Sequence, residues 1–107
     1  MAMANIAIEI DKDKLRDFCR RWKITEFALF GSVVRPEEFR ADSDVDVLVT
    51  FARDAKWSLF DFVHAQDELA EIFGRPVDLV ERVAVEESPN RFRKRSILNS
   101  VVLLDVA

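Results

Sequence analysis

The sequence is short of several residue types, and each shortage excludes a class of protein. It has 107 residues with no tyrosine, one cysteine and two glycines. The lone thiol, Cys19, cannot form an intramolecular disulfide. No apolar run approaches the ~20 residues that a membrane-spanning helix needs, and the N-terminus lacks a basic segment followed by an apolar signal core. These absences favour a soluble cytoplasmic protein with no membrane partner.

Charge of neither sign dominates the chain. The formal net charge is -4, and acidic and basic residues are mixed along the sequence, which argues against direct binding of nucleic acid as the main role. Half of the residues are hydrophobic, which is enough for one core and too few for a second. We therefore expect a single domain over residues 1–107, and we expect a separate protein to present any acceptor group.

A short apolar run ends at a glycine–serine pair. Residues 27–30 read Phe-Ala-Leu-Phe and precede Gly31 and Ser32, the pattern of a buried strand that enters a turn. Glycine lets the backbone approach a ligand closely, and the amides that follow can donate hydrogen bonds to phosphate oxygens together with the Ser32 hydroxyl. The pair predicts a phosphate-binding turn.

Two aspartates stand at the start of the next predicted strand. Asp44 and Asp46 are two residues apart in a β-branched, apolar segment, and alternate side chains of a strand point to the same face. Carboxylates that close raise each other's pKa unless a cation lies between them, and an all-oxygen site suits magnesium or manganese. Both aspartates are therefore candidate metal ligands.

A third carboxylate, Asp78, lies in another β-rich segment, residues 77–81, introduced by a glycine and a proline. If the two strands are neighbours, Asp78 completes a cluster with Asp44 and Asp46. Three carboxylates on adjacent strands can hold two metal ions about 3.5 to 4 Å apart, which bind the attacking and leaving oxygens of an in-line displacement. The pattern predicts phosphoryl or nucleotidyl transfer.

Together, the Gly31-Ser32 pair, the Asp44-Val45-Asp46 sequence and the later Val77-Asp78-Leu79-Val80 segment resemble the minimal nucleotidyltransferases of the DNA polymerase beta superfamily. The similarity covers nearly the whole chain and is strongest to the antitoxins of HEPN/MNT toxin–antitoxin pairs. It implies a polymerase-beta-like α/β fold, with a small mixed β-sheet and helices packed mainly on one side. It also implies transfer of AMP from ATP to a hydroxyl, in the antitoxins a tyrosine of the HEPN-domain ribonuclease toxin.

The resemblance implies a role for each residue of the site. Asp44 and Asp46 would bind two Mg2+ ions, for which Mn2+ could substitute. Asp78 would bind the ion nearer the acceptor hydroxyl and assist deprotonation of that hydroxyl. Gly31 and Ser32 would hold the β- and γ-phosphates of ATP. Because this chain has no tyrosine, any tyrosine it modifies belongs to a partner.

The sequence departs from the family pattern after the glycine–serine pair. Arg35 is followed by Pro36 where a glycine is usual, and proline lacks an amide donor and disfavours helix at the residue before it. The loop before the aspartate pair is also slightly longer than usual. We therefore expect a truncated helix here, with an effect on turnover rather than on binding. Arg35 can bind the triphosphate or pair with Glu37 or Glu38, and the sequence leaves both open.

Capping residues and apolar spacing predict the other elements. Three helices are expected: one capped by Asp11 or Asp13 and carrying Leu15, Phe18, Cys19 and Trp22 as its apolar stripe, one from Ser58 to about Phe73 with Gly74 as its stop, and one from Ser88-Pro89 to about Leu98. Strands are expected near residues 26–30, 45–51, 77–81 and 101–105, preceded by a short strand or an extended lead-in at Ile6, Ile8 and Ile10.

Three further features have a plain structural interpretation. Cys19 is typical of a small buried hydrophobe rather than of a reactive thiol. His64, the only histidine, is more typical of a surface or packing residue than of a base. The cations between Arg91 and Arg95 form either a solvated helix face or a docking patch for an acidic partner surface or an RNA-bound toxin.

Two other functions also fit the sequence. A non-catalytic binding module would neutralise its partner by complex formation, and exposed apolar surface together with the Arg91–Arg95 cations would carry that role. A metal-dependent phosphodiester hydrolase would use the same carboxylates, but it has no need of a phosphate-binding turn upstream.

Overall fold

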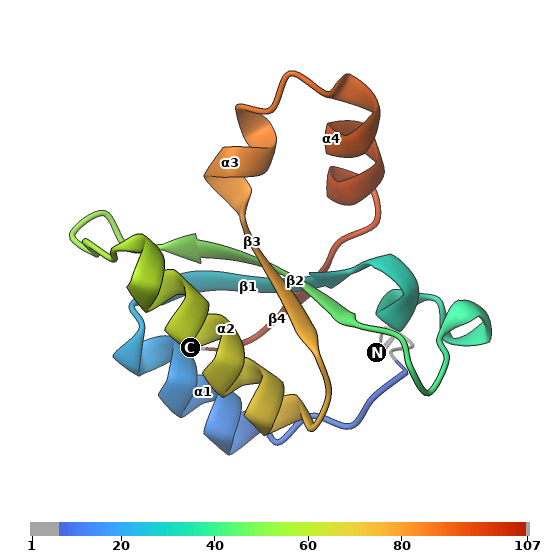
Figure 1. Cartoon of the computed structure of the whole chain (residues 1–107), viewed down its shortest axis with the longest axis horizontal. Coiled ribbons are helices and arrows are strands. Elements are labelled where there is room, and N and C mark those ends of the chain that lie inside the picture. Colours follow the sequence, from blue (N-terminus) through green and yellow to red (C-terminus); the bar gives the residue numbers. More distant parts are fainter. Residues whose placement is uncertain (1–6, 107) are drawn as a thin grey trace.

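The computed structural model of the protein describes residues 7–106, in which a mixed four-stranded sheet carries helices on both faces (Figure 1). The strands are β1 (Ile24–Phe30), β2 (Val45–Phe51), β3 (Val77–Glu81) and β4 (Val102–Leu104), in the order β3-β2-β1-β4. β1 pairs antiparallel with β2 and with β4, whereas β2 and β3 are parallel. The predicted α/β fold with a small mixed sheet is confirmed.

The larger core lies between one face of the sheet and two helices, α1 (Lys12–Arg21) and α2 (Leu59–Phe73). Phe27 and Leu29 of β1 and the odd-numbered residues of β2 point into it because side chains alternate along a strand. Full burial of one such aliphatic or aromatic side chain stabilises the fold by about 1.5–3 kcal/mol. The side chains of this core include Leu15, Phe18, Cys19, Phe27, Leu29, Val45, Val47, Val49, Ala65 and Leu69.

The ends of α1 and α2 follow the predicted capping residues. The Asp11 side chain accepts a hydrogen bond from the Lys14 amide (3.2 Å). Ser58 and Asp61 form a reciprocal capping box, and Gly74 ends α2 in the left-handed conformation, with φ 70°. Burial raises the pKa of the Cys19 thiol to about 12, in keeping with a buried, unreactive cysteine. Within residues 7–106, no helix has the length and apolarity to cross a membrane.

Two short helices, α3 (Arg82–Glu86) and α4 (Arg91–Leu98), cover part of the opposite face of the sheet (Figure 1). We call this the α3–α4 face. Its smaller core contains Ala28, Phe30, Leu48, Val85 and Ile97. Helix α3 was not anticipated from the sequence, because its five residues contain no period that distinguishes a helix from the preceding strand.

The predicted helix start at Ser88-Pro89 is wrong. Helix α4 begins two residues later, because the Asn90 side chain accepts a hydrogen bond from the Arg93 amide (3.0 Å) and so acts as the N-cap. The Ser88 hydroxyl instead accepts a hydrogen bond from the Asn90 amide (3.2 Å), which leaves Pro89 in the turn before the helix.

The segment before α1 is a lead-in rather than a strand over residues 7–10. The Ala7 amide donates to the Val33 carbonyl (2.9 Å), and Ile8 and Ile10 pack against the larger core. Ile6, the first residue of the predicted alternation, lies outside the described residues.

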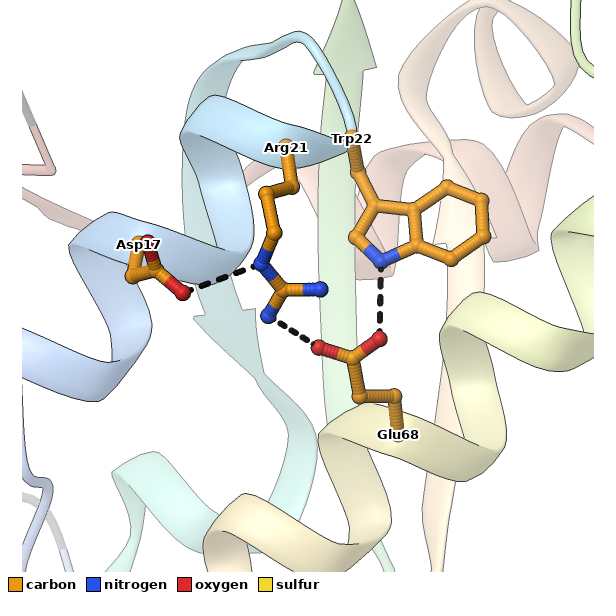
Figure 2. A network of polar contacts seen from close by, with 4 residues as sticks. All are labelled: Asp17, Arg21, Trp22 and Glu68. Atoms are coloured by element: carbon orange, nitrogen blue, oxygen red, sulfur yellow. Dashed lines mark hydrogen bonds and ion pairs between the residues drawn. The ribbon is translucent and has the colours of Figure 1, made fainter.

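Glu68 of α2 forms hydrogen bonds with residues at the end of α1 (Figure 2). Its carboxylate accepts hydrogen bonds from the Arg21 guanidinium and from the Trp22 indole N–H, the latter at 3.2 Å. Arg21 also donates to Asp17 one turn earlier (2.9 Å). These contacts, above all the bond from Arg21, lower the pKa of Glu68.

We expect Glu68→Gln to lower the free energy of unfolding by about 1 kcal/mol at pH 7. Because the folded-state pKa is depressed, this contribution is present above the pKa of the unfolded chain and is lost as pH falls through the folded-state pKa. Urea titrations at pH 7 and pH 3.5 measure the difference, which should shrink at the lower pH. Asp17→Asn is the control, because it removes only the exposed pair within α1; an equal effect of both variants at pH 7 would contradict a special role for Glu68.

Candidate active site

The register of the sheet places two of the predicted aspartates side by side. Asp46 lies on the inner strand β2, directly opposite Asp78 in the parallel ladder to β3 and opposite Phe30 in the antiparallel ladder to β1. Registered neighbours project from the same face of a sheet. Both carboxylates are therefore on the α3–α4 face, and the condition for Asp78 to join the cluster, that the two strands are neighbours, is met.

The third aspartate, Asp44, comes directly before β2. Asp44 is two residues before Asp46, so an extended backbone at this point directs both side chains toward the same face. Asp44 and Asp78 are exposed, whereas Asp46 is half-buried. The site thus has one inner carboxylate and two outer ones that are accessible from solvent.

Gly31 makes room for the inner carboxylate. It follows the last residue of β1 and has φ +75°, in the left-handed region. A Cβ atom at this position would lie 2.1 Å from Oδ2 of Asp46, far inside van der Waals contact. The glycine of the predicted phosphate-binding turn and the aspartate of the predicted metal site are therefore adjacent, which joins the two predicted features into one site.

The electrostatics of Asp46 reflect this crowded position. Burial, followed by the negative charges of Asp78 and Asp44, raises the pKa of Asp46 to about 6. Arg35 acts in the opposite direction and lowers it. A carboxylate held in this state is stabilised by a nearby cation, because a positive charge favours its ionised form.

The three aspartates supply oxygen ligands, which suit a hard divalent cation. Their side chains do not yet converge on one metal position. Within residues 7–106, no three carboxylate, imidazole or thiolate groups are close enough together to hold a metal ion. Like charges separate where no cation lies between them, and the outer carboxylates of Asp44 and Asp78 are exposed and free to rotate. The assignment of the three aspartates as metal ligands stays a prediction.

The segment after Gly31 forms two short 3-10 helices, η1 (Gly31–Val34) and η2 (Pro36–Glu38). Arg35 interrupts them with φ -126° and ψ 81°, outside the helical region, as expected for a residue that precedes proline. The expected truncation is therefore observed. Ser32 is half-buried at the start of η1.

Arg35 pairs with Glu38 at 2.8 Å, one of the two alternatives that the sequence left open. The same guanidinium still influences the pKa of Asp46, so it lies within electrostatic reach of the site. A role toward a triphosphate requires exchange of Glu38 for a phosphate oxygen, and both groups are on the surface.

One residue that orders the site was missed at the level of sequence. Arg75, just before β3, stacks on the Phe39 ring at 4.5 Å and donates hydrogen bonds to the carbonyls of Ser43 (3.2 Å) and Arg40 (3.4 Å). These contacts hold the loop that precedes Asp44 against the start of β3. No local sequence pattern marks such a role, because its partners lie more than thirty residues away.

We expect the metal-free protein to lose stability as pH rises from about 4 to 6. The folded-state pKa of Asp46 lies above its ordinary value, so the unfolded chain loses this proton first and ionisation favours unfolding. For a group in partial contact with solvent, the effect is about 1 kcal/mol. Thermal melts of the wild type and Asp46→Asn across this range, with chelator present, measure it. The variant should be the more stable protein at pH 7.5 and equal to the wild type at pH 3.5; a less stable variant at pH 7.5 would contradict this account.

Comparison with known proteins shows the family to which the chain belongs. The chain belongs to the nucleotidyltransferase domain family, whose model matches residues 12–104. Among named relatives, the protein adenylyltransferase MntA of Thermococcus cleftensis is 37% identical over 75 residues, which cover 70% of this chain and 70% of that protein.

Solved structures share the fold. A provisionally assigned minimal nucleotidyltransferase is 29% identical with a TM-score of 0.65, over 87% of this chain and 88% of that one. A toxin–antitoxin structure with AMP-PNP gives a TM-score of 0.65 at 20% identity, over 88% of this chain and 72% of that one. A complex of a tri-AMPylated Shewanella oneidensis HEPN toxin with its MNT antitoxin gives a TM-score of 0.54 at 18% identity, over 86% of this chain and 66% of that one.

Proposed function

We propose that this protein is a metal-dependent protein adenylyltransferase that transfers AMP from ATP to a tyrosine hydroxyl of a HEPN-domain ribonuclease toxin, and that it thereby acts as the antitoxin. The observation that carries the proposal is the junction of Gly31, Asp46 and Asp78 at one edge of the α3–α4 face. The name of the Thermococcus relative and the AMPylated toxin in a structural neighbour support the same activity.

The aspartates would hold Mg2+, or Mn2+ in its place. Bound divalent ions supply charge neutralisation of the phosphates and a lower pKa for the attacking hydroxyl. Asp46, the most buried of the three, would be the inner ligand, with Asp44 as a second ligand. Asp78 would be the outer ligand on the acceptor side. Its exposed carboxylate would accept the proton of the tyrosine hydroxyl.

The Gly31–Ser32 turn would hold the β- and γ-phosphates of ATP. The Ser32 hydroxyl and the first amides of η1 are the donors, and Arg35 adds positive charge after its release from Glu38. In the reaction, the acceptor oxygen bonds to the α-phosphorus, the bond from that phosphorus to the bridging oxygen breaks, and pyrophosphate leaves. We place this activity in the cytoplasm and in one domain over residues 1–107.

The test uses ATP labelled in turn at the α- and the γ-phosphate, incubated with magnesium, this protein and the HEPN-domain protein proposed as its partner. Label from the α-position alone should appear on the partner. Label from the γ-position would indicate phosphoryl transfer, and release of nucleotide without labelled protein would indicate a hydrolase. Tight complex formation with neither product would favour a non-catalytic module that neutralises its partner by complex formation.

We expect Asp78→Asn to reduce turnover about a hundredfold while ATP affinity changes by less than about threefold, because general-base assistance contributes on the order of 100- to 10,000-fold to a rate and the phosphates bind elsewhere. Single-turnover rates and equilibrium titration with a non-hydrolysable ATP analogue separate the two quantities. Equal losses of rate and of nucleotide affinity would contradict the role assigned to Asp78.

A further inference from the structure

The cations of α4 are uncompensated. Arg91, Arg93 and Arg95 are exposed. The ion pairs formed among residues 7–106 involve other cations: Arg21, Lys23, Arg35 and Arg82. Two exposed glutamates at the end of α3, Glu86 and Glu87, are near in sequence, but they do not pair with α4. The positive charge of this helix is therefore directed to solvent.

Helix stability accounts for Arg95, which lies in the last turn where a cation is favourable, but it does not explain the two arginines of the first turn. The N-terminus of a helix carries partial positive charge, and a cation there costs about 0.3–1 kcal/mol. Arg91 and Arg93 occupy the first and third positions after the Asn90 cap, and the first turn contains no acidic residue. Arg91 and Arg95, four positions apart on one side of the helix, repel each other as well. The sequence keeps charge of the unfavourable sign at this end.

The same surface exposes a large aromatic side chain. Phe92 lies between the two first-turn arginines, and 89% of its surface is exposed. Arginine and aromatic residues are the side chains most enriched at the centres of protein interfaces. An exposed phenylalanine flanked by unpaired arginines has the composition of a binding surface. A face that is only solvated has no need of an exposed phenylalanine.

Helix α4 stands on the face that an acceptor must approach. Its C-terminal end packs there: Ile97 and Leu98 join the core that contains Ala28, Phe30 and Leu48, and the first turn of the helix stands away from the sheet (Figure 1). Asp46 projects from that same face, two residues before Leu48 on β2, which is about 7 Å along a strand. A folded protein that presents a hydroxyl to Asp46 and Asp78 therefore approaches on the side of the sheet from which α4 projects (Figure 1).

We infer that residues 91–95 of α4 dock an acidic surface of the acceptor protein. This inference rests on the proposed function, because it takes the acceptor to be a protein. Charge complementarity requires acidic groups opposite the arginines, while the carboxylates of Asp44 and Asp78 keep those groups away from the reacting atoms. RNA is the poorer occupant, because a polyanion long enough to span the helix also meets these carboxylates and a chain of net charge -4.

A matched pair of double variants tests the inference. Arg91→Glu/Arg93→Glu reverses the first and third positions of α4. Lys12→Glu/Lys14→Glu reverses the first and third positions of α1, on the opposite face of the sheet, with the same change in net charge. Both changes place acidic residues at a helix N-terminus, so both are expected to keep the fold or to stabilise it, and thermal melts check this.

Affinity for the HEPN-domain protein proposed as the acceptor is measured without nucleotide, at low and at physiological salt. The α4 variant should bind about tenfold more weakly or worse and show less dependence on salt, whereas the α1 variant should bind within about twofold of wild type. Equal weakening by both variants, or no weakening by the α4 variant, would overturn the inference. The inference would also be overturned, in favour of RNA, if the α4 variant lost binding to a labelled oligouridylate while its affinity for the HEPN-domain protein stayed unchanged.

The two proposals fail separately. Binding that depends on α4, with no AMP on the partner, would leave the docking surface standing and remove the proposed activity. AMP transfer to the partner, with binding that does not depend on α4, would support the proposed activity and remove the docking surface.

Discussion

Asp46→Asn is expected to abolish AMP transfer while the fold stays intact. Because we propose Asp46 as the inner metal ligand, its removal should forfeit several kcal/mol of charge stabilisation in the transition state, and each 1.36 kcal/mol is tenfold in rate. We therefore expect a loss of about a thousandfold or more in the single-turnover rate. Asp44→Asn should have a comparable effect, because the same ions depend on it.

Asp67→Asn serves as the control for these variants. Asp67 is an exposed aspartate of α2, on the other side of the sheet, and its loss should leave the rate unchanged. Stability provides a second readout, because Asp46→Asn should raise the metal-free melting temperature at pH 7.5, where ionised Asp46 is unfavourable. Full activity of Asp46→Asn would contradict the mechanism.

Gly31→Ala is expected to damage both the site and the fold. The new Cβ would meet Oδ2 of Asp46 at 2.1 Å, and the backbone would have to hold φ +75° with a side chain present. The carboxylate must then move by an ångström or more, and a displacement of that size in a catalytic group can cost about a hundredfold in rate. Together with backbone strain of about 1–2 kcal/mol, this predicts loss of both activity and stability.

Gly74→Ala separates the two causes. Gly74 has nearly the same conformation, φ +70°, but a Cβ there would meet no atom within 4 Å. This variant should lose about 1–2 kcal/mol of stability from strain alone and keep its rate of transfer. If both variants lose stability equally and retain activity, the close approach of Gly31 to Asp46 has no part in catalysis.

The sequence predicts this fold well where a local pattern determines local structure. The ends of α2 were predicted because Ser58 and Gly74 act through neighbours within a few residues, as the capping box and the left-handed Gly74 show. The four strands were predicted from short apolar runs that the sheet buries. Pro36 likewise predicted the break between η1 and η2, because its effect on Arg35 is steric and local.

The site could be predicted only in part because its geometry depends on contacts distant in sequence. The motif pointed to Asp46 and Asp78 as members of one site, but their register arises from the parallel pairing of β2 with β3. The contacts of Arg75 with the loop before Asp44 have no local signature. Helix α3 and the start of α4 were missed because short, capped turns depend on side-chain hydrogen bonds, such as that of Asn90, and not on a repeating pattern.

The most direct test of the central claim is the intact mass of the HEPN-domain protein after co-expression with the wild type and with Asp46→Asn. The account predicts a partner that gains the mass of one or more AMP groups, located on tyrosine by fragmentation, only in the presence of the wild type. A partner that stays unmodified but is neutralised equally by both proteins would contradict it and would show that binding alone carries the function.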